Sequence, residues 1–488
     1  MIIHRRRFLT GTAAGAVDTG TGDPTPPNPA TSSREVDLPA VDAPAELTPD
    51  GPLDVRVERD VIDEAVEAAG TRGALPAPTA AIITRWHQDP FARGSYSYLP
   101  LDFDPGDRSA LRAEIDGRVF FAGEATSDDY AGTVHGALLE GRAAADRIAA
   151  TASHDDEIAI VGAGVAGLAA ARQLTDAGHT VFVLEGRERI GGRLWTDTSL
   201  GVPVELGAGW VHGDRDNPLI GLADDAGVRL VETDGEDIVV YDADGVRVDR
   251  EVLEAVIARF DDLDVGDPRS LEEILAAETA DADLATCALA RYVLTSLVEH
   301  DEAASIRDLR PASVEVGEVL AGPDLVPPDG YVGMLAPLLH GVAIDLGHVV
   351  TSIGHDAHGV RIGLEDGAVV RSDRVLVTAP LGVLQAGDID FEPPLPTEKR
   401  VAIDRLGVGV LDRVILRFDE RFWDDVNVIG FVGNEPSLFV EWYDLTDIVG
   451  APVIIGFNSG DVADALAVRT DQQIIEAAMR ALATIYGH

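Results

Sequence analysis

Three glycines lie at a spacing that suits the binding of a dinucleotide. Gly162, Gly164 and Gly167 form the pattern G-x-G-x-x-G, and Glu185 follows 18 positions after the last of them. In such a pattern the first glycine permits a tight turn, the second lets a pyrophosphate approach the backbone, and the third lets helix and strand pack closely. The carboxylate can accept hydrogen bonds from a ribose. The spacing therefore predicts a dinucleotide site rather than glycines that serve only a turn.

The surrounding sequence supplies the strands and helices that would position this site. Residues 157–161 predict a buried strand that leads into the glycines, residues 168–178 predict the helix after them, and residues 180–184 predict a further strand. Upstream, residues 118–122 predict another buried strand and residues 133–150 a helix rich in alanine and leucine. Strands that alternate with helices indicate an α/β fold with a doubly wound parallel sheet. The helix N-terminus would offer free N–H groups and a positive dipole end to phosphates.

The composition indicates a large, acidic globular protein. Its 488 residues correspond to about three domain-sized units, and 46% apolar residues are enough for a large core. With 38 basic and 85 acidic residues the formal charge is −47, which argues against a nucleic-acid partner. Lys399 is the single lysine. Because such a surface repels itself in dilute buffer and salt screens that repulsion, we expect a salt-adapted protein, with an ordinary acidic enzyme as the alternative.

The first residues differ in composition from the rest of the chain. Arg5, Arg6 and Arg7 precede a weakly apolar run of small residues, which resembles a twin-arginine export signal. A basic tail without a targeting role is the alternative. Residues 18–52 are rich in Pro, Thr, Ser, Asp and Gly, as is typical of a linker. No apolar stretch approaches the roughly 18 residues of a membrane span, so we expect no integral membrane segment.

The sequence after Glu185 indicates which dinucleotide binds. It reads GRERIGGRLWT, with Gly191, Gly192 and Arg193, and then VELGAGWVHG. These motifs, together with the downstream stretches DGYVGMLAPLL and RVLVTAPLGVLQ, resemble the FAD-containing amine oxidase family, which includes monoamine oxidases, polyamine oxidases and lysine-specific histone demethylases. The resemblance covers about residues 80–488. It implies a Rossmann-type FAD-binding domain joined to an α+β substrate domain with a mixed sheet.

By this resemblance, a defined set of residues holds FAD. Glu185 contacts the adenosine ribose, the backbone of Val350 contacts the adenine, and Glu124 contacts the ribityl chain. The N–H groups around Thr133 and Val134 face the flavin C2 carbonyl, where a helix N-terminus stabilises negative charge. The complete set implied for the cofactor is Gly162, Gly164, Gly167, Glu185, Arg187, Gly191, Gly192, Arg193, Gly209, Trp210, Val350, Trp86, Gly123, Glu124, Thr133 and Val134.

The single cysteine favours a non-covalent flavin. Monoamine oxidases attach the flavin through a cysteine, but the matching stretch here, residues 122–134, has none. Cys287 lies in an unrelated apolar run, DLATCALARYVL, where a small buried side chain is expected. One cysteine also excludes an intrachain disulfide and a cysteine-based metal cluster, and we assign no metal site.

The resemblance also places side chains where an amine would enter. Tyr96 matches an aromatic residue beside the flavin face. Thr133 takes the place of a second tyrosine of monoamine oxidases, so this side is more similar to polyamine oxidases or the demethylases. Trp210 and His212 match residues of the substrate channel, and Trp86 is expected to line the flavin pocket. For the aromatic residues, packing in the core is the alternative.

Arg413 departs from the family pattern. The family has L-N-K-V, whose lysine is bridged by a water to flavin N5, whereas this chain reads LDRV. Arginine is always charged and forks its donors, while lysine is a point charge whose pKa can shift. The water-bridging role could therefore survive, weaken or be lost. We group Arg413 with Tyr96 and Thr133 as the candidate catalytic residues.

These residues predict an FAD-dependent amine oxidase. A small-molecule amine, either a monoamine or a polyamine, would give up a hydride to flavin N5, and the imine would hydrolyse to an aldehyde. Oxygen would reoxidise the flavin and yield hydrogen peroxide. Positioning and a desolvated site would carry most of the catalysis, with no obligatory base. An L-amino-acid oxidase and a catalytically impaired FAD-binding protein are the alternatives.

The order of the motifs is unusual. In the family the segment TRWHQDPFARGSYSYLP, followed by RVFFAGEATSDDYAGTVHGALLEG, lies at the C-terminus, but here it precedes the glycines, within residues 84–149. The chain therefore resembles a circular permutant with a fusion near residues 151–156; a gene-assembly artefact is the alternative. The predicted domains are an export signal and linker (1–72), a substrate-domain segment with the flavin-facing strand (73–110), the FAD-binding domain (111–240), a helical substrate domain (241–330), a further FAD-binding segment (331–385) and the substrate domain (386–488).

Overall fold

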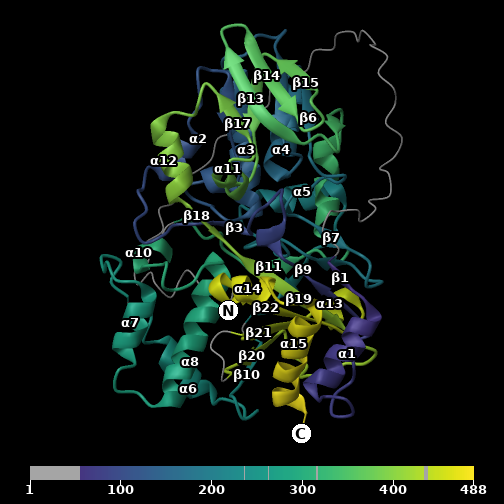
Figure 1. The fold of residues 1–488 in the computed structure, drawn as a ribbon, viewed down its shortest axis with the longest axis vertical. Helices are drawn as coiled ribbons and strands as arrows, with labels where there is room; N and C mark the ends of the chain where they lie inside the picture. Colours follow the sequence, from purple (N-terminus) through teal and green to yellow (C-terminus); the bar gives the residue numbers. More distant parts are fainter. Residues whose placement is uncertain (1–54, 236, 262, 315–316, 434–437, 488) are drawn as a thin grey trace, which may run out of the picture.

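Two halves, which meet across the middle of the molecule, make up the folded chain (Figure 1). The computed structural model describes residues 55–487 except residues 236, 262, 315–316 and 434–437. The predicted export signal and most of the predicted linker lie outside the described residues. One half contains a parallel sheet and the other a larger mixed sheet, which confirms the predicted fold class.

The first half is built on a five-stranded parallel sheet with the order β12-β6-β5-β16-β4. Strands β5 and β6 have the predicted bounds. The upstream strand β4 joins the same sheet, but β16 lies between it and β5. The strands are β4 (Val119–Phe121), β5 (Glu157–Val161), β6 (Thr180–Leu184), β12 (Ala343–Asp345) and β16 (Arg374–Val377).

Different layers cover the two faces of this sheet. Helices α3 (Val134–Ala149) and α4 (Val165–Asp176) cover one face and share an apolar cluster with Phe120. Phe121, the next residue of the strand, belongs to a separate cluster on the opposite face, because successive strand residues point to opposite sides. A second sheet covers that face, with β13 (Val350–Asp356), β14 (Gly359–Leu364), β15 (Val369–Ser372) and β17 (Asp390–Glu392).

The second half is built on a seven-stranded sheet that is antiparallel except where β10 pairs with β20. In spatial order the strands are β1 (Arg56–Val57), β2 (Ala80–Ile83), β19 (Leu411–Arg417), β22 (Val453–Ser459), β21 (Glu441–Asp444), β20 (Val428–Phe431) and β10 (Ile238–Tyr241). Helices α1 (Arg59–Ala69) and α15 (Asp471–Tyr486) pack on this sheet. A second apolar cluster contains α6 (Arg250–Ile257), α7 (Leu271–Glu278) and α8 (Leu284–Leu294). Among the described helices, none combines the length and the hydropathy needed to cross a membrane.

Short elements lie between the two halves (Figure 1). The described residues include three small antiparallel pairs, and two of them join segments that are far apart in the sequence. These pairs are β3 (Tyr96–Tyr98) with β18 (Gly407–Gly409), β9 (Val231–Thr233) with β11 (Asp324–Val326), and β7 (Thr196–Asp197) with β8 (Val204–Glu205).

Three predicted domain boundaries need correction. The first predicted unit, the export signal and linker, ended at residue 72, but its last part contains β1 and α1, whose residues Ile62 and Val66 share an apolar cluster with α15. The predicted FAD-binding domain ended at residue 240, although β10 pairs with β20 of the other half. The predicted FAD-binding segment ended at residue 385, although β17 pairs with β13. Hydrophobic patterning does not show which distant strand a segment will pair with, so these ends were misplaced.

Candidate active site

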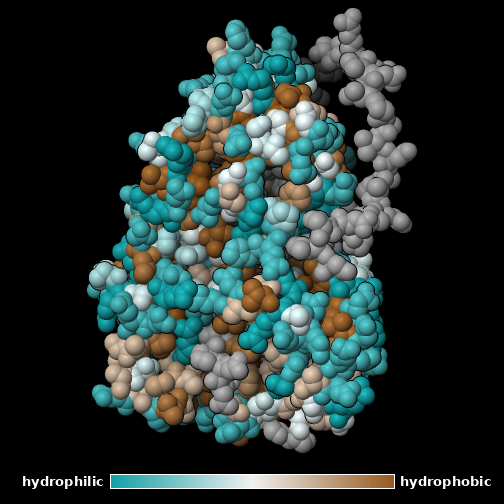
Figure 2. Space-filling model, viewed as in Figure 1, coloured by the Kyte–Doolittle hydropathy of each residue, from teal (hydrophilic) through white to brown (hydrophobic). Residues whose placement is uncertain are grey.

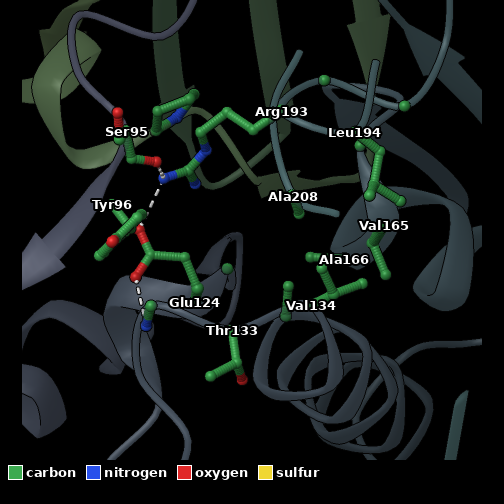
Figure 3. A pocket seen from close by; sticks show the side chains of 18 of the residues that line it. Ser95, Tyr96, Glu124, Thr133, Val134, Val165, Ala166, Arg193, Leu194 and Ala208 are labelled. Carbon is green, nitrogen blue, oxygen red and sulfur yellow. Dashed lines mark hydrogen bonds and ion pairs between the residues drawn. The ribbon is translucent and has the colours of Figure 1, made fainter. Parts of the chain in front are cut away.

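The two halves enclose a cavity of about 370 Å³. This volume is in the range of small-molecule and cofactor sites. Its wall combines the loop between β5 and α4, the N-terminus of α3, and side chains from β19, β21 and β22. Figure 3 shows part of this wall from close by. Every residue predicted to touch the cofactor or the substrate lines this cavity, with the exception of Gly167.

The glycine-rich loop leaves space along the cavity wall. Gly162 has a φ of +104°, a conformation that favours glycine. A Cβ added at Gly164 would meet nothing within 4 Å beyond its chain neighbours, and this residue lines the cavity. Gly167 lies behind the wall, where an added Cβ would be 2.0 Å from the carbonyl oxygen of Gly162. The three glycines therefore serve the turn, the close approach and the helix packing that the sequence predicts.

Glu185 connects the end of β6 to this loop. Its Oε2 accepts a hydrogen bond from the N–H of Ala163 at 2.7 Å, and its Oε1 accepts one from the N–H of Arg187 at 2.9 Å. The side chain is buried and lines the cavity. Each carboxylate oxygen has a second lone pair, so Glu185 keeps acceptor capacity for the hydroxyl groups of a ribose.

Arg187 carries a buried donor that the protein leaves unpaired. Its Nη2 lies 2.7 Å from Oδ1 of Asp89, and both side chains are 2% exposed. Its Nη1 is buried and has no hydrogen-bond partner, although Arg187 lines the cavity. A buried guanidinium N–H without an acceptor is costly, and a phosphate oxygen would satisfy it. Together with the open glycine loop, this orphaned donor fits the diphosphate of FAD.

Glu124 joins three segments on another side of the cavity (Figure 3). Its Oε1 accepts from Arg193 at 2.8 Å, and its Oε2 accepts from the hydroxyl of Ser97 at 2.7 Å and from the N–H of Gly132 at 2.9 Å. Burial raises the pKa of Glu124, but Arg193 and the hydrogen bond from Ser97 outweigh burial and hold that pKa below its ordinary value. The carboxylate is therefore charged and fixes β3 and Arg193 at the wall.

The N-terminus of α3 reaches the cavity through Thr133 and Val134. Thr133 is the N-cap: its Oγ1 accepts from the N–H of Gly136 at 3.0 Å and donates to the carbonyl oxygen of Tyr130 at 2.7 Å. The hydroxyl of this candidate catalytic residue is thus engaged in capping the helix. The first turn of α3 presents the positive end of a helix, as the prediction for the flavin C2 carbonyl requires.

A cluster of aromatic side chains forms another end of the cavity. The ring centroids of Trp210 and Tyr443 are 5.3 Å apart, and those of Tyr443 and Phe457 are 5.2 Å apart. Tyr96 lies on β3 and donates its hydroxyl to the carbonyl oxygen of His300 at 2.8 Å. These five residues all line the cavity. Sequence motifs indicated Tyr96 and Trp210 but missed the other three, which lie in segments without a recognised motif.

Arg413 is buried beside this cluster. Its guanidinium carbon lies 5.2 Å from the ring centroid of Phe457 and 5.7 Å from that of Trp210, and its Nη1 donates to the carbonyl oxygen of Glu205. Burial lowers the pKa of Arg413 to about 10 and raises the pKa of Glu205 to about 7. Arg413 therefore lines the cavity as a charged group that already has protein partners.

Two further predicted residues have contacts with other parts of the wall. His212 lines the cavity, and its Nδ1 lies 3.1 Å from Oδ2 of Asp324. Trp86 lines the cavity and also belongs to the core, because it is 4% exposed and donates its Nε1–H to the carbonyl oxygen of Leu206 at 3.0 Å. Trp86 therefore both lines the cavity and packs in the core.

Comparisons with known proteins identify the family to which this chain belongs. The sequence profile of the family described as flavin containing amine oxidoreductase matches residues 53–149, 165–321 and 321–488. The chain belongs to this family. It is 32% identical over 346 residues to Polyamine oxidase 4 of Oryza sativa subsp. japonica, covering 66% of this chain and 71% of that protein. It is 30% identical over 362 residues to Lysine-specific histone demethylase 2 of Homo sapiens, covering 68% of this chain and 44% of that protein.

A solved structure shares the fold of this amine oxidase. A triple mutant from a redesign of cofactor binding in putrescine oxidase matches with a TM-score of 0.53 and 22% identity, covering 68% of this chain and 81% of that chain. Because the family is flavin-containing and the residues at the cavity fit the cofactor, FAD is the cofactor of this enzyme.

The enzyme oxidises an amine. When bound, FAD supplies the hydride acceptor and passes the electrons to oxygen. The glycine loop and Arg187 would hold the diphosphate, and the aromatic cluster would exclude water around the amine. The alternative of an L-amino-acid oxidase is not favoured, because the relatives that match this chain include polyamine oxidases.

Proposed function

We propose that the substrate is an amine with a second cationic nitrogen, that is, a diamine or polyamine. The observation that carries this proposal is a group of carboxylates on the described lining: Asp301, Glu302, Glu318 and Asp324. A wall of one sign of charge attracts cationic ligands. Relatives named polyamine oxidases in Oryza sativa subsp. japonica and Arabidopsis thaliana lend further support.

A linear diamine needs an apolar path for its methylene groups and an anionic group at its far end. The rings of Trp210, Tyr443 and Phe457 supply the apolar path. The carboxylates of Asp301 and Glu302 follow His300 directly in the chain, so one short segment joins the aromatic cluster to the acidic part of the wall. A monoamine would use only the first of these features.

The experiment compares 1,4-diaminobutane with 1-aminobutane, which differ by one amino group. We expect kcat/KM for peroxide formation to be about tenfold higher or more for the diamine, since tenfold corresponds to about 1.4 kcal/mol. Glu302→Gln should reduce this ratio. Glu365→Gln, an exposed control between β14 and β15, should keep it. Equal values for the two amines would contradict the proposal.

We further propose that the family's segments occur here in permuted order. In support, β4 and α3 precede β5 and α4 in the chain but join the same sheet and the same cavity wall, and residues 150–156 connect the two units. Arg480 of α15 donates to the carbonyl oxygen of Ala68 at 3.2 Å, so α15 lies beside the segment that leads into β2. Trypsin should release residues 148–172 as one peptide across the connection. Mass spectrometry of the natural protein that finds two separate ends instead would identify an assembly artefact.

Salt adaptation is proposed from the charge of −47 and the position of the single lysine. Lys399 is 2% exposed and donates to the carbonyl oxygen of Ala110 at 3.0 Å, so it contributes no charge to the surface. The face in Figure 2 is mainly hydrophilic. Since the Debye length falls from about 10 Å at 0.1 M salt to about 3 Å at 1 M, Tm should rise by several degrees with salt. An unchanged Tm would contradict this proposal.

Two proposals from the sequence concern the cofactor bond and the cellular location. FAD should be non-covalent, since Cys287 lies in α8 and is absent from the cavity lining. Acid precipitation should therefore release all the yellow colour into solution. Export by the twin-arginine route is proposed from Arg5, Arg6 and Arg7. Residues 1–52 fused to a reporter should direct export, and a double substitution of Arg6→Lys and Arg7→Lys should abolish it.

A further inference from the structure

His300 lines the cavity and carries an unpaired ring nitrogen. The residue begins α9 (His300–Glu302), is 6% exposed and lines the cavity. Its Nδ1 lies 3.0 Å from Oε2 of Glu441. Its Nε2 is buried and has no hydrogen-bond partner. Because buried polar atoms in folded proteins are nearly always paired, this nitrogen indicates a group that the site binds.

Glu441 determines which nitrogen of His300 carries the proton. Glu441 lies on β21 with its side chain 1% exposed, and its Oε1 accepts a hydrogen bond from Oγ of Ser296. A carboxylate can only accept hydrogen bonds, so the neutral imidazole keeps its proton on Nδ1 and leaves Nε2 as an acceptor. If Nε2 takes up a proton, the charge of the imidazolium is balanced by Glu441 at 3.0 Å.

His300 also lies where the reacting amine is expected. The hydroxyl of Tyr96, assigned to the flavin face, donates to the carbonyl oxygen of His300 at 2.8 Å. The ring centroids of His300 and Phe457 are 6.1 Å apart. Titratable groups that adjoin this imidazole or share its cavity wall include Tyr96 on β3, Glu299 directly before it in the chain, Asp301 and Glu302 on α9, Arg413 on β19, and Glu441 and Tyr443 on β21.

We propose that Nε2 of His300 takes a proton from the ammonium group of the substrate, an inference that rests on the proposed amine substrate. An alkyl amine has a pKa of about 10 and arrives protonated at neutral pH, whereas the nitrogen needs a free lone pair when hydride leaves the neighbouring carbon. In the step, one N–H bond of the ammonium breaks and an Nε2–H bond forms. A neutral amine and an imidazolium paired with Glu441 result, and no electrons are transferred. The sequence predicted no obligatory base, whereas His300 supplies one.

The pH dependence of anaerobic flavin bleaching tests this proposal. If the enzyme contains the base, the protonated amine is the form that binds, and the second-order rate constant should be nearly flat between about pH 7.5 and about pH 9. If the enzyme has no base, only the neutral amine reacts. The rate constant then rises about tenfold per pH unit over the same range.

Two variants should convert the flat pH profile into the profile that rises with pH. His300→Gln keeps a polar group at this position but cannot take the proton, and should lower the rate constant near neutral pH about 100-fold. Glu441→Gln removes the charge that stabilises the imidazolium and should produce the same rising profile with a smaller loss. His212→Gln is the matched control, because His212 lines the same cavity but is bound to Asp324. It should alter KM and leave the profile flat.

The outcomes separate this proposal from the proposed substrate class. A flat profile in the FAD-loaded His300→Gln and Glu441→Gln enzymes would overturn the assignment, and so would a wild-type profile that already rises tenfold per pH unit. The profile is measured with whichever of 1,4-diaminobutane and 1-aminobutane bleaches the wild-type flavin faster. Loss of the diamine preference would therefore contradict the substrate class alone, while a change of slope in the variants would still support His300.

Discussion

The two ends of the cavity are built in different ways. At the cofactor end, six consecutive residues, 162–167, make the turn, the open wall and the start of α4, and their contacts are mainly those of the backbone. At the amine end, Tyr96, Trp210, His300 and Arg413 come from segments that are far apart in the chain. The first end depends on the absence of side chains, and the second depends on which side chains are present.

This difference determines how each end responds to substitution. A backbone site loses its ligand when a Cβ or a larger group enters its space, whatever the chemistry of that group. A side-chain site can change its rate or its preferred amine through one residue while the fold and the cofactor stay in place. Variants at the two ends should therefore separate cofactor content from turnover.

Gly164→Val should have the largest effect on the cofactor end. A Cβ at Gly164 meets no protein atom within 4 Å beyond its chain neighbours, so the valine should be tolerated by the fold but occupy cavity space. We expect FAD affinity to fall about tenfold or more, or about 1.4 kcal/mol. The measurement is the flavin absorbance per protein after dialysis. Gly221→Val, at an exposed helical glycine that is also open, is the control. Full FAD content in Gly164→Val would contradict the claim that FAD binding needs the open space at this glycine.

Arg413→Lys should affect turnover and spare the cofactor. The guanidinium lies between Phe457, Trp210 and the carbonyl of Glu205, in the position where the family has lysine. The shorter, single-point charge should allow a water to lie at flavin N5, and we expect flavin reduction to be about tenfold faster. Stopped-flow bleaching under anaerobic amine measures this rate. A slower rate with FAD retained would mean that Arg413 is adapted to catalysis, and loss of FAD would mean that LDRV does not match the lysine motif.

The local backbone at the cofactor end could be predicted from the sequence. The glycine spacing, the strand before it and Glu185 are local features, and short-range sterics determine the turn that they form. The bounds predicted for β5 and β6 and the contacts of Glu185 with the loop follow from the same local pattern. Family motifs also predicted that Glu124 and Arg193 would both lie at this cavity, although 69 positions separate them in the sequence.

Long-range pairing limited the prediction at the amine end. His300, Tyr443 and Phe457 were missed because an apolar or histidine-containing segment does not indicate which cavity it will face. The pair of His300 and Glu441 spans 141 positions and carries no motif. The insertion of β16 between β4 and β5 has the same cause, since strand order depends on contacts between distant segments.

Glu205 lies beside Arg413 at the amine end, and its ionisation makes stability depend on pH. Its Oε1 accepts from the N–H of Tyr331 at 2.8 Å and from the hydroxyl of Thr196 at 2.7 Å, while its carbonyl oxygen accepts from Arg413. Its Oε2 is buried without a partner. Burial raises the pKa of this carboxyl from 4.5 to about 7. The folded state therefore binds the proton more tightly than the unfolded state does.

Glu205→Gln should have the smallest effect on activity but flatten the pH dependence of stability. The stabilisation from a raised pKa is fully present below about pH 4.5 and is lost as the pH rises through about 7, a change on the order of 3 kcal/mol. Glutamine can keep the Oε1 acceptor but does not ionise, so this part of the pH dependence should disappear. Burial also raises the pKa of Asp412 to about 7, so a residual dependence of stability on pH should remain in this variant. Urea unfolding of the FAD-loaded enzyme near pH 5 and pH 8, with Glu365→Gln as the exposed control, measures the difference. An unchanged slope in Glu205→Gln would show that Glu205 ionises without cost because the neighbouring Arg413 compensates its charge.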